Sequence, residues 1–255
     1  MTIEGNIQTV TDEIAANYAI HAMASTNSYH NGSDRITFPI DKLGWRLVDM
    51  DGKPTAASSR EHGFTGLAFD IYEKDGSDDV IFAFRGTNNY KDYLWANFAI
   101  WPFNLQYRQA KDDFLLYRDN PRNSRKKIKV TGHSLGGGLS LCISVNYGIE
   151  AITFNPSPRV FDGLGDKHEK SERIAVYEKG EVLDLARKLW RKDNEVIPRE
   201  NLYQCNYSHS LNIVKQHSSD LLALGLLKQA ARVDPSLVPV LDALPPKHVG
   251  WVELV

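Results

Sequence analysis

Alternating hydrophobic and polar positions predict short strands in the first half of the chain. Leu67, Phe69 and Ile71 recur at every second position within residues 64–72, which is the period of a strand with one buried face. After an acidic turn, the apolar run Val80–Phe84 predicts a buried strand that pairs with the first as an antiparallel hairpin. Apolar runs of the same kind predict three further strands, at residues 127–131, 151–154 and 173–177.

Other segments have apolar residues at helical spacing, and these lie before, between and after the predicted strands. Ile14, Tyr18 and Ala22 share one face of a helix expected from Thr11 to Met23, with Thr11 or Asp12 as its cap. Further helices are expected at residues 109–119, 137–145 and 218–232. Because strands alternate with helices in the second half, we expect a mostly parallel central sheet with helices on both faces. The 255 residues fit a single α/β domain, residues 1–255.

Composition and charge exclude several classes of function. Hydrophobic residues make up 42% and charged residues 24% of the chain, as in ordinary globular proteins. The net charge of −2 argues against a nucleic-acid binder. Residues 1–6 lack a basic region followed by an apolar run, so no cleaved secretory signal is visible. We therefore expect a cytoplasmic protein, or one exported without a cleaved signal peptide, as a secretion-system effector would be.

The segment Gly132-His133-Ser134-Leu135-Gly136 is the most informative motif of the chain. It joins a predicted strand to a predicted helix, and a nucleophilic serine needs such a sharp turn. Glycine two positions before and two positions after Ser134 removes the collisions that side chains would cause there. The side chain of His133 is expected to point away from the site and to be structural.

A nucleophilic serine needs a base and an acid that follow it in the chain. An acid just after the strand 173–177 is expected, and both Glu181 and Asp184 qualify. His217 precedes the final helix and is our first candidate for the base, with His209 and His248 as alternatives. The sequence alone leaves the choice between the two acids open.

The oxyanion of the tetrahedral intermediate needs two backbone N–H donors. Leu135 follows the serine and offers the first. Thr87 ends the segment Phe84-Arg85-Gly86-Thr87 after the strand Val80–Phe84 and offers the second, with Gly86 permitting close approach of the substrate.

Three segments together resemble the class 3 lipase family, the fungal-lipase-like α/β-hydrolases. They are the oxyanion segment Ala83–Thr87, the elbow Thr131–Gly137 and the segment Thr153–Val160, in which Asn155 stands where the family has glycine. The resemblance implies an α/β-hydrolase fold with Ser134 as nucleophile and His217 as base. It also implies Thr87 and Leu135 as oxyanion residues. Glu181 occupies the position at which the family usually has aspartate.

In this family the segment after the oxyanion strand is often a lid. Residues 91–108 take that place, and their aromatic side chains predict either an apolar lid that opens at a lipid surface or a fixed helix. The basic residues between Arg122 and Lys129 are expected to form a solvated loop away from the site.

We therefore expect a serine carboxylic-ester hydrolase of the lipase class. It would cleave glycerolipids, phospholipids or small esters through an acyl-enzyme, with peripheral membrane contact and without a metal or organic cofactor. An acyltransferase with the same triad, or an inactive hydrolase fold that serves as a binding module, is the alternative. No nucleic-acid partner is expected, and the sequence does not identify a protein partner.

Overall fold

The computed structural model describes residues 7–30, 35–87, 102–161, 167–184, 196–208 and 212–252. Within these residues the strands form a single mixed sheet with the order β1-β9-β8-β7-β6-β5-β4-β2, and β3 pairs with β4 outside that path. The strands are β1 (Gln8–Thr9), β2 (Trp45–Val48), β3 (Arg60–Glu61), β4 (Ala68–Lys74), β5 (Asp79–Phe84), β6 (Lys127–His133), β7 (Ala151–Phe154), β8 (Arg173–Glu178) and β9 (Leu202–Cys205). The part from β5 to β1 is parallel, whereas β4 runs antiparallel to β5, β2 and β3.

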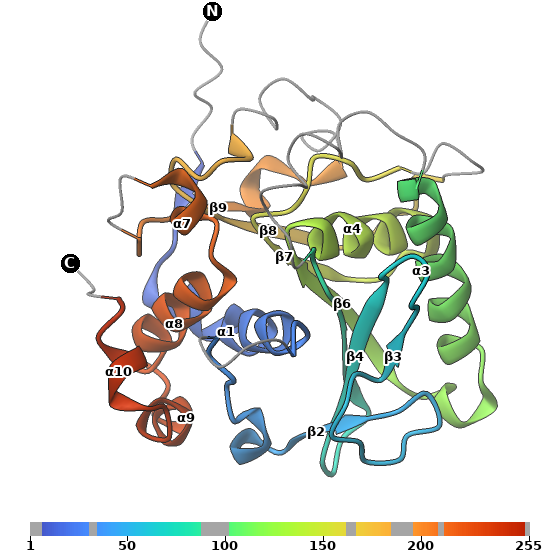
Figure 1. The fold of residues 1–255 in the computed structure, drawn as a ribbon, viewed down its shortest axis with the longest axis horizontal. Helices are drawn as coiled ribbons and strands as arrows, with labels where there is room; N and C mark the ends of the chain where they lie inside the picture. The colour runs from blue at the N-terminus through green and yellow to red at the C-terminus, as the bar shows by residue number, and fades with distance from the viewer. Residues whose placement is uncertain are drawn as a thin grey trace, which may run out of the picture.

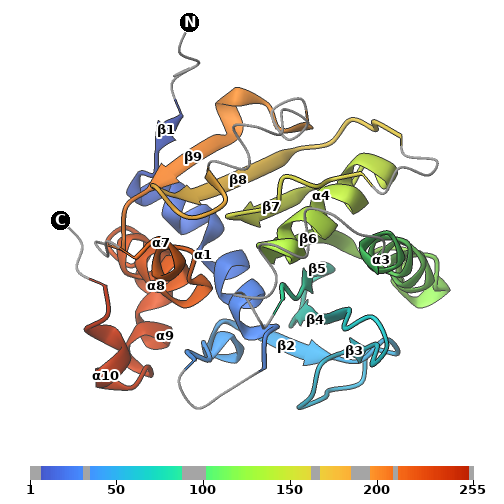
Figure 2. The same cartoon turned by 45° about the horizontal axis from the view of Figure 1, so that its top comes forward.

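Helices cover both faces of this sheet (Figures 1 and 2). One face carries α1 (Asp12–Asn27) and α8 (Ser219–Ala230), and the other carries α3 (Pro102–Arg118) and α4 (Leu135–Tyr147). The short helices are α7 (Ile213–Gln216), α9 (Val238–Asp242) and α10 (Pro246–Val249). Among the described helices, none combines the length and hydropathy of a membrane span. The arrangement confirms the predicted mostly parallel sheet with helices on both faces.

Strand β5 shows why the sheet is buried on both sides. Ile81 and Ala83 contact the layer of α1 and α8, while Val80, Phe82 and Phe84 contact the layer of α3 and α4. Since side chains alternate along a strand, a continuous apolar run satisfies both layers at once. The predicted antiparallel hairpin of β4 and β5 is confirmed.

Side-chain caps are observed at the start of two helices, and the one at Thr11 was predicted. The side chain of Thr11 accepts a hydrogen bond from the Ile14 N–H at the start of α1. The side chain of Ser218 accepts one from the Leu221 N–H at the start of α8. Each cap satisfies a helix-end donor that would otherwise lack a partner within the helix.

Helix α3 begins earlier than the predicted residue 109. Tyr107, Ala110, Phe114 and Tyr117 are all buried at helical spacing, so the helical face extends back into the aromatic segment. Proline is tolerated at a first helical position, which allows the start at Pro102. Residues 102–108 of the predicted lid thus belong to this helix. Residues 91–101 lie outside the described residues, and a lid there stays a prediction.

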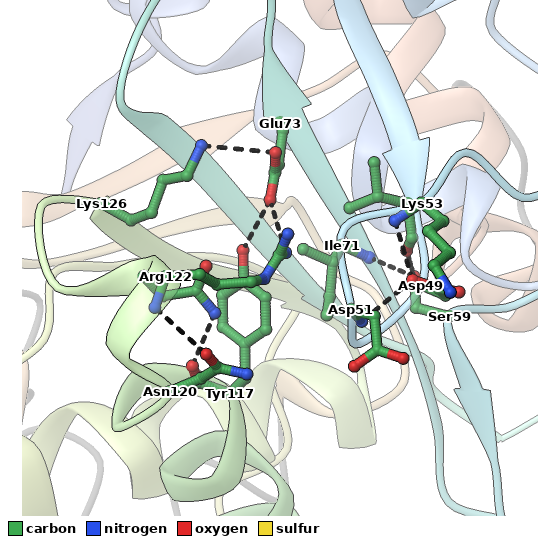
Figure 3. Close-up of polar contacts among 12 residues, drawn as sticks. Asp49, Asp51, Lys53, Ser59, Ile71, Glu73, Tyr117, Asn120, Arg122 and Lys126 are labelled. Carbon is green, nitrogen blue, oxygen red and sulfur yellow. Dashed lines mark hydrogen bonds and ion pairs between the residues drawn. The ribbon is translucent and has the colours of Figure 1, made fainter.

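The basic residues before β6 are not simply a solvated loop, contrary to expectation. Arg122 and Lys126 lie 3.0 and 3.3 Å from the carboxylate of Glu73 on β4, and the Tyr117 hydroxyl donates to the same carboxylate (Figure 3). Because Glu73 is buried, it needs this compensation for its charge. The cluster ties α3 and the start of β6 to β4, at the end of β6 opposite Ser134.

Candidate active site

Ser134 lies at the junction of β6 and α4 in a conformation that non-glycine residues seldom adopt. Its backbone angles are φ 58° and ψ −122°. Three backbone hydrogen bonds hold it there: its N–H donates to Phe154 O at 3.1 Å, and its carbonyl accepts from Ser157 and Gly138 at 2.8 and 3.1 Å. Strain that the surroundings enforce in this way is concentrated at functional sites in proteins.

The glycines on either side of Ser134 leave no room for a side chain. A Cβ atom on Gly132 would lie 2.3 Å from the carbonyl carbon of Gly136. A Cβ atom on Gly136 would lie 2.1 Å from the carbonyl oxygen of Phe84 at the end of β5. The predicted role of these glycines is confirmed, and the elbow is pressed directly onto the strand that leads to the oxyanion segment.

His217 and Glu181 form a buried hydrogen-bonded pair. Nδ1 of His217 lies 2.5 Å from Oε2 of Glu181, and the side chains are 2% and 0% exposed. The same Oε2 accepts the Leu183 N–H at 2.9 Å, which fixes the carboxylate. Glu181 follows β8 through a turn in which Gly180 has φ 74°, and His217 stands between α7 and the cap of α8.

The other candidates for acid and base lie elsewhere or outside the described residues. Asp184 is partly exposed and donates its backbone N–H to the carbonyl oxygen of Glu181. His248 is on α10, where its ring lies 4.5 Å from that of Trp251. His209 lies outside the described residues. The carboxylate that the structure brings to His217 is therefore Glu181.

His133 does not point away from the site as expected. Its ring centroid lies 4.6 Å from that of His217, so His217 lies beside the residue that precedes Ser134. The alternation of side chains along β6 explains why His133 faces His217. Thr131 and His133 share one face of the strand, and Thr131 contacts the backbone of α1 on that face. The segment that carries His217 leads into α8, which covers the same face.

Tyr29, just after α1, joins the elbow to the oxyanion segment. Its hydroxyl lies 3.1 Å from Nδ1 of His133. A Cβ atom on Gly86 would lie 2.1 Å from that hydroxyl, so only glycine fits here. Burial raises the pKa of Tyr29 well above its usual value, against the opposing effects of Arg35 and of a hydrogen bond from the Gly86 N–H. The neutral hydroxyl can therefore donate to Nδ1 of His133 when that nitrogen carries no proton.

The two predicted oxyanion residues follow directly on the segments that the Tyr29 hydroxyl contacts. Leu135 is the first residue of α4, directly after Ser134. Thr87 follows Gly86 and is partly exposed. The preceding Arg85 is buried and binds Glu61 on β3 at 2.6 Å, and its N–H donates to the carbonyl of Ala68. The segment that ends in Thr87 is therefore anchored to β3 and β4.

Asn155 connects the end of β7 to the end of β8, the strand that precedes Glu181. It has φ 43°, a region that asparagine enters more readily than most residues, so it can replace the glycine of the lipase pattern. Its side-chain oxygen accepts the Glu178 N–H at 2.8 Å. The buried Glu178 carboxylate in turn accepts the N–H of Ser208, in the segment that leads toward His217. Sequence reasoning missed Glu178 and Tyr29, because neither carries a local signal.

Comparison with solved structures concerns the fold of the chain. A lipase II from Rhizopus niveus superposes with a TM-score of 0.50 at 13% identity, over 72% of this chain and 80% of that chain. The Rhizomucor miehei lipase–propeptide complex gives 0.48 at 13% identity, over 71% of this chain and 66% of that chain, just under two thirds of its length. At these identities the likeness concerns the fold, which is the expected α/β-hydrolase fold.

The sequence itself matches a family model. No curated protein matches the chain significantly. The model of the phospholipase-like family described as a Tle-like phospholipase domain matches residues 20–186, well over half of the chain, and includes Ser134 and Glu181. The chain therefore belongs to this phospholipase-like family of lipolytic hydrolases, as a Tle-like phospholipase domain.

Proposed function

We propose that the chain is a serine phospholipase that hydrolyses an acyl ester of a glycerophospholipid through an acyl-enzyme. The observation that carries the proposal is the buried hydrogen bond between His217 and Glu181, with the His217 ring against His133, the residue before the strained Ser134. Family membership supports a lipid ester as the substrate. Peripheral contact with the lipid surface is part of the proposal, and the 94% exposed side chain of Phe64 before β4 is available for it.

Each of these groups has a role in the acyl transfer that we propose. Glu181 holds the proton on Nδ1 of His217, which leaves Nε2 to accept the proton of the Ser134 hydroxyl. The serine oxygen attacks the ester carbonyl, and the backbone N–H groups of Thr87 and Leu135 stabilise the oxyanion. His217 then returns the proton to the leaving lysophospholipid alcohol. In the second half, water gives a proton to His217 and attacks the acyl-enzyme, and His217 returns that proton to the Ser134 oxygen as the fatty acid leaves.

The test compares wild type with Ser134→Ala on phospholipid vesicles and on a short nitrophenyl ester. We expect fatty acid release by wild type only, together with labelling of wild type by a fluorophosphonate. Ser140→Ala is the matched control, because Ser140 lies on the same helix and binds only the Gly136 carbonyl among its described partners. Equal activity of wild type and Ser134→Ala on both substrates would contradict the proposal and favour a binding module. Acyl transfer to an added alcohol in preference to water would favour an acyltransferase.

A further inference from the structure

A cavity lies on the face of the sheet covered by α1. It has a volume of about 600 Å³ and is bounded by the end of α1, residues 35–41, β2 and β4. Neither Ser134 nor His217 lines it. Its charged wall residues are His30, Arg35 and Arg46 together with Asp41 and Asp75, and His30 and Arg35 lie at the end nearest to α1 in the sequence. The cavity is large enough for a phospholipid headgroup, and the question is which charge it accepts.

His30 lines this cavity and is paired with a carboxylate that is fully buried. Nε2 of His30 lies 2.7 Å from Oδ2 of Asp70, whose side chain is 0% exposed, whereas that of His30 is 27% exposed. The hydroxyl of Tyr72 donates to the same Asp70 oxygen at 3.0 Å. The hydrogen bond to Asp70 raises the pKa of His30, against the effect of burial. The buried carboxylate thus favours the imidazolium form.

Arg35 repeats this arrangement on the same wall. Its side chain is 34% exposed, and its NH1 lies 3.7 Å from Oδ2 of Asp220, whose side chain is 10% exposed. NH1 also donates to the Ser219 hydroxyl at 3.2 Å. Since a guanidinium has five N–H donors, one hydrogen bond leaves donors for a ligand. In both pairs the carboxylate is more buried than its basic partner. The N–H groups of His30 and Arg35 that these pairs leave unused therefore remain available to a ligand in the cavity.

Tyr29 places these two cations next to the reacting groups. His30 is the next residue in the chain, and the Arg35 guanidinium lies 4.3 Å from the centroid of the Tyr29 ring. The guanidinium thus lies over the face of the ring whose hydroxyl contacts Gly86 and His133. One tyrosine side chain therefore separates the cations from the elbow and the oxyanion segment. In a glycerophospholipid, the glycerol separates the phosphate from the acyl esters by a similarly short distance.

We propose that His30 and Arg35 bind the phosphodiester group of the glycerophospholipid substrate. The proposal rests on the proposed function, because it names the feature of the substrate that the same site recognises. Arginine and protonated histidine are suited to a phosphate oxygen, since charge-assisted hydrogen bonds are stronger than neutral ones. A triacylglycerol offers these donors only neutral ester oxygens and no anionic group. The site therefore favours phospholipids over neutral glycerolipids. A free phosphate ion has the same chemistry, and the experiment separates the two sources.

The experiment measures kcat/KM of the full chain on a phosphatidylethanolamine and on a diacylglycerol with the same acyl chains, in the same neutral micelles. We expect Arg35→Gln and His30→Gln each to lower the phospholipid-to-diacylglycerol ratio about tenfold. Arg118→Gln is the matched control, because its side chain is also 34% exposed and pairs with Asp119 at the far end of α3. An unchanged ratio in both variants, with both substrates falling together or neither falling, would overturn the proposal.

A binding measurement keeps this proposal separate from catalysis. Calorimetry on Ser134→Ala uses glycerophosphoethanolamine, a phosphodiester without acyl chains, and inorganic phosphate. We expect the phosphodiester to bind and Arg35→Gln to abolish binding, even if no lipid is hydrolysed. Binding of phosphate alone would show a free-anion site and contradict recognition of the substrate. If Arg35→Gln does not fold, as judged by thermal unfolding, Arg35→Lys and His30→Gln carry the same comparison.

Discussion

The hydroxyl of Tyr29 lies 3.1 Å from Nδ1 of His133 and fills the space beside Gly86 that a side chain would need. One oxygen atom thus fixes the distance between the segment that carries the nucleophile and the segment that carries Thr87. Oxyanion stabilisation depends on donors held in place before the reaction begins. Tyr29 is therefore a positioning residue, although it follows a helix far from Ser134 in the sequence.

The variant Tyr29→Phe keeps the ring and removes this hydroxyl. We expect kcat on a soluble ester to fall about tenfold with little change in KM, because the Gly86 N–H and His133 lose a buried partner. Tyr18→Phe, on α1 and only partly buried, is the control and is expected to retain wild-type kinetics. A rise in KM at constant kcat would assign Tyr29 to substrate binding instead.

Substitution of the two carboxylates after β8 separates their roles. Glu181→Gln is expected to lower kcat by about 10³-fold, because an amide can donate its proton to Nδ1 and stabilise the wrong tautomer of His217. Asp184→Asn is expected to keep kcat within about twofold, since the structure pairs His217 with Glu181. Steady-state kinetics on one soluble ester measures both. The reverse order of effects would make Asp184 the acid.

The contact between the elbow and β5 predicts a severe effect of Gly136→Ala. Its Cβ atom would lie 2.1 Å from the Phe84 carbonyl oxygen, so either the backbone moves or the protein does not fold. We expect a loss of about 3 kcal/mol or more in the free energy of unfolding, measured by urea denaturation. Gly63→Ala is the control, because nothing lies within 4 Å of its added atom. Similar stabilities of the two variants would contradict this packing.

His21 predicts loss of stability in acid. Burial on α1 lowers its pKa from 6.5 to about 3. Between these values the unfolded chain binds a proton that the folded chain does not, so the free energy of unfolding decreases as the pH falls from about 6.5 toward 3. We expect His21→Gln to show a shallower decrease over this range in urea titrations. Parallel curves for the two proteins would mean that His21 titrates normally in the fold.

Local patterns were sufficient for much of the fold. The alternation of Leu67, Phe69 and Ile71 predicts β4 because one side of that strand contacts α3 and α4. The glycines of the elbow predict the close approach of β6, α4 and β5. The start of α3 was missed because its buried residue Tyr107 lies among other aromatic residues, which hide the helical period.

The arrangement of the candidate site depends on contacts between segments far apart in the sequence, which no local pattern encodes. Glu181 and Asp184 are three residues apart after β8, and what distinguishes them is that Glu181 is buried against His217 whereas Asp184 is partly exposed. His133 approaches His217 because α8 covers the same face of the sheet as α1, which is a property of the whole fold. The catalytic roles of Ser134, His217, Thr87 and Leu135 stay predictions until the variants are measured.

The proposed centre combines groups from different layers of the molecule. Tyr29 and His217 adjoin α1 and α8, which contact each other on one face, whereas Ser134 stands between the sheet and α4 on the other. The proposed reaction therefore requires that the α1–α8 layer and the sheet, which share one hydrophobic core, keep their alignment. A core substitution that displaces α1 or α8 from the strands would separate the base from the nucleophile even if the elbow itself were unchanged.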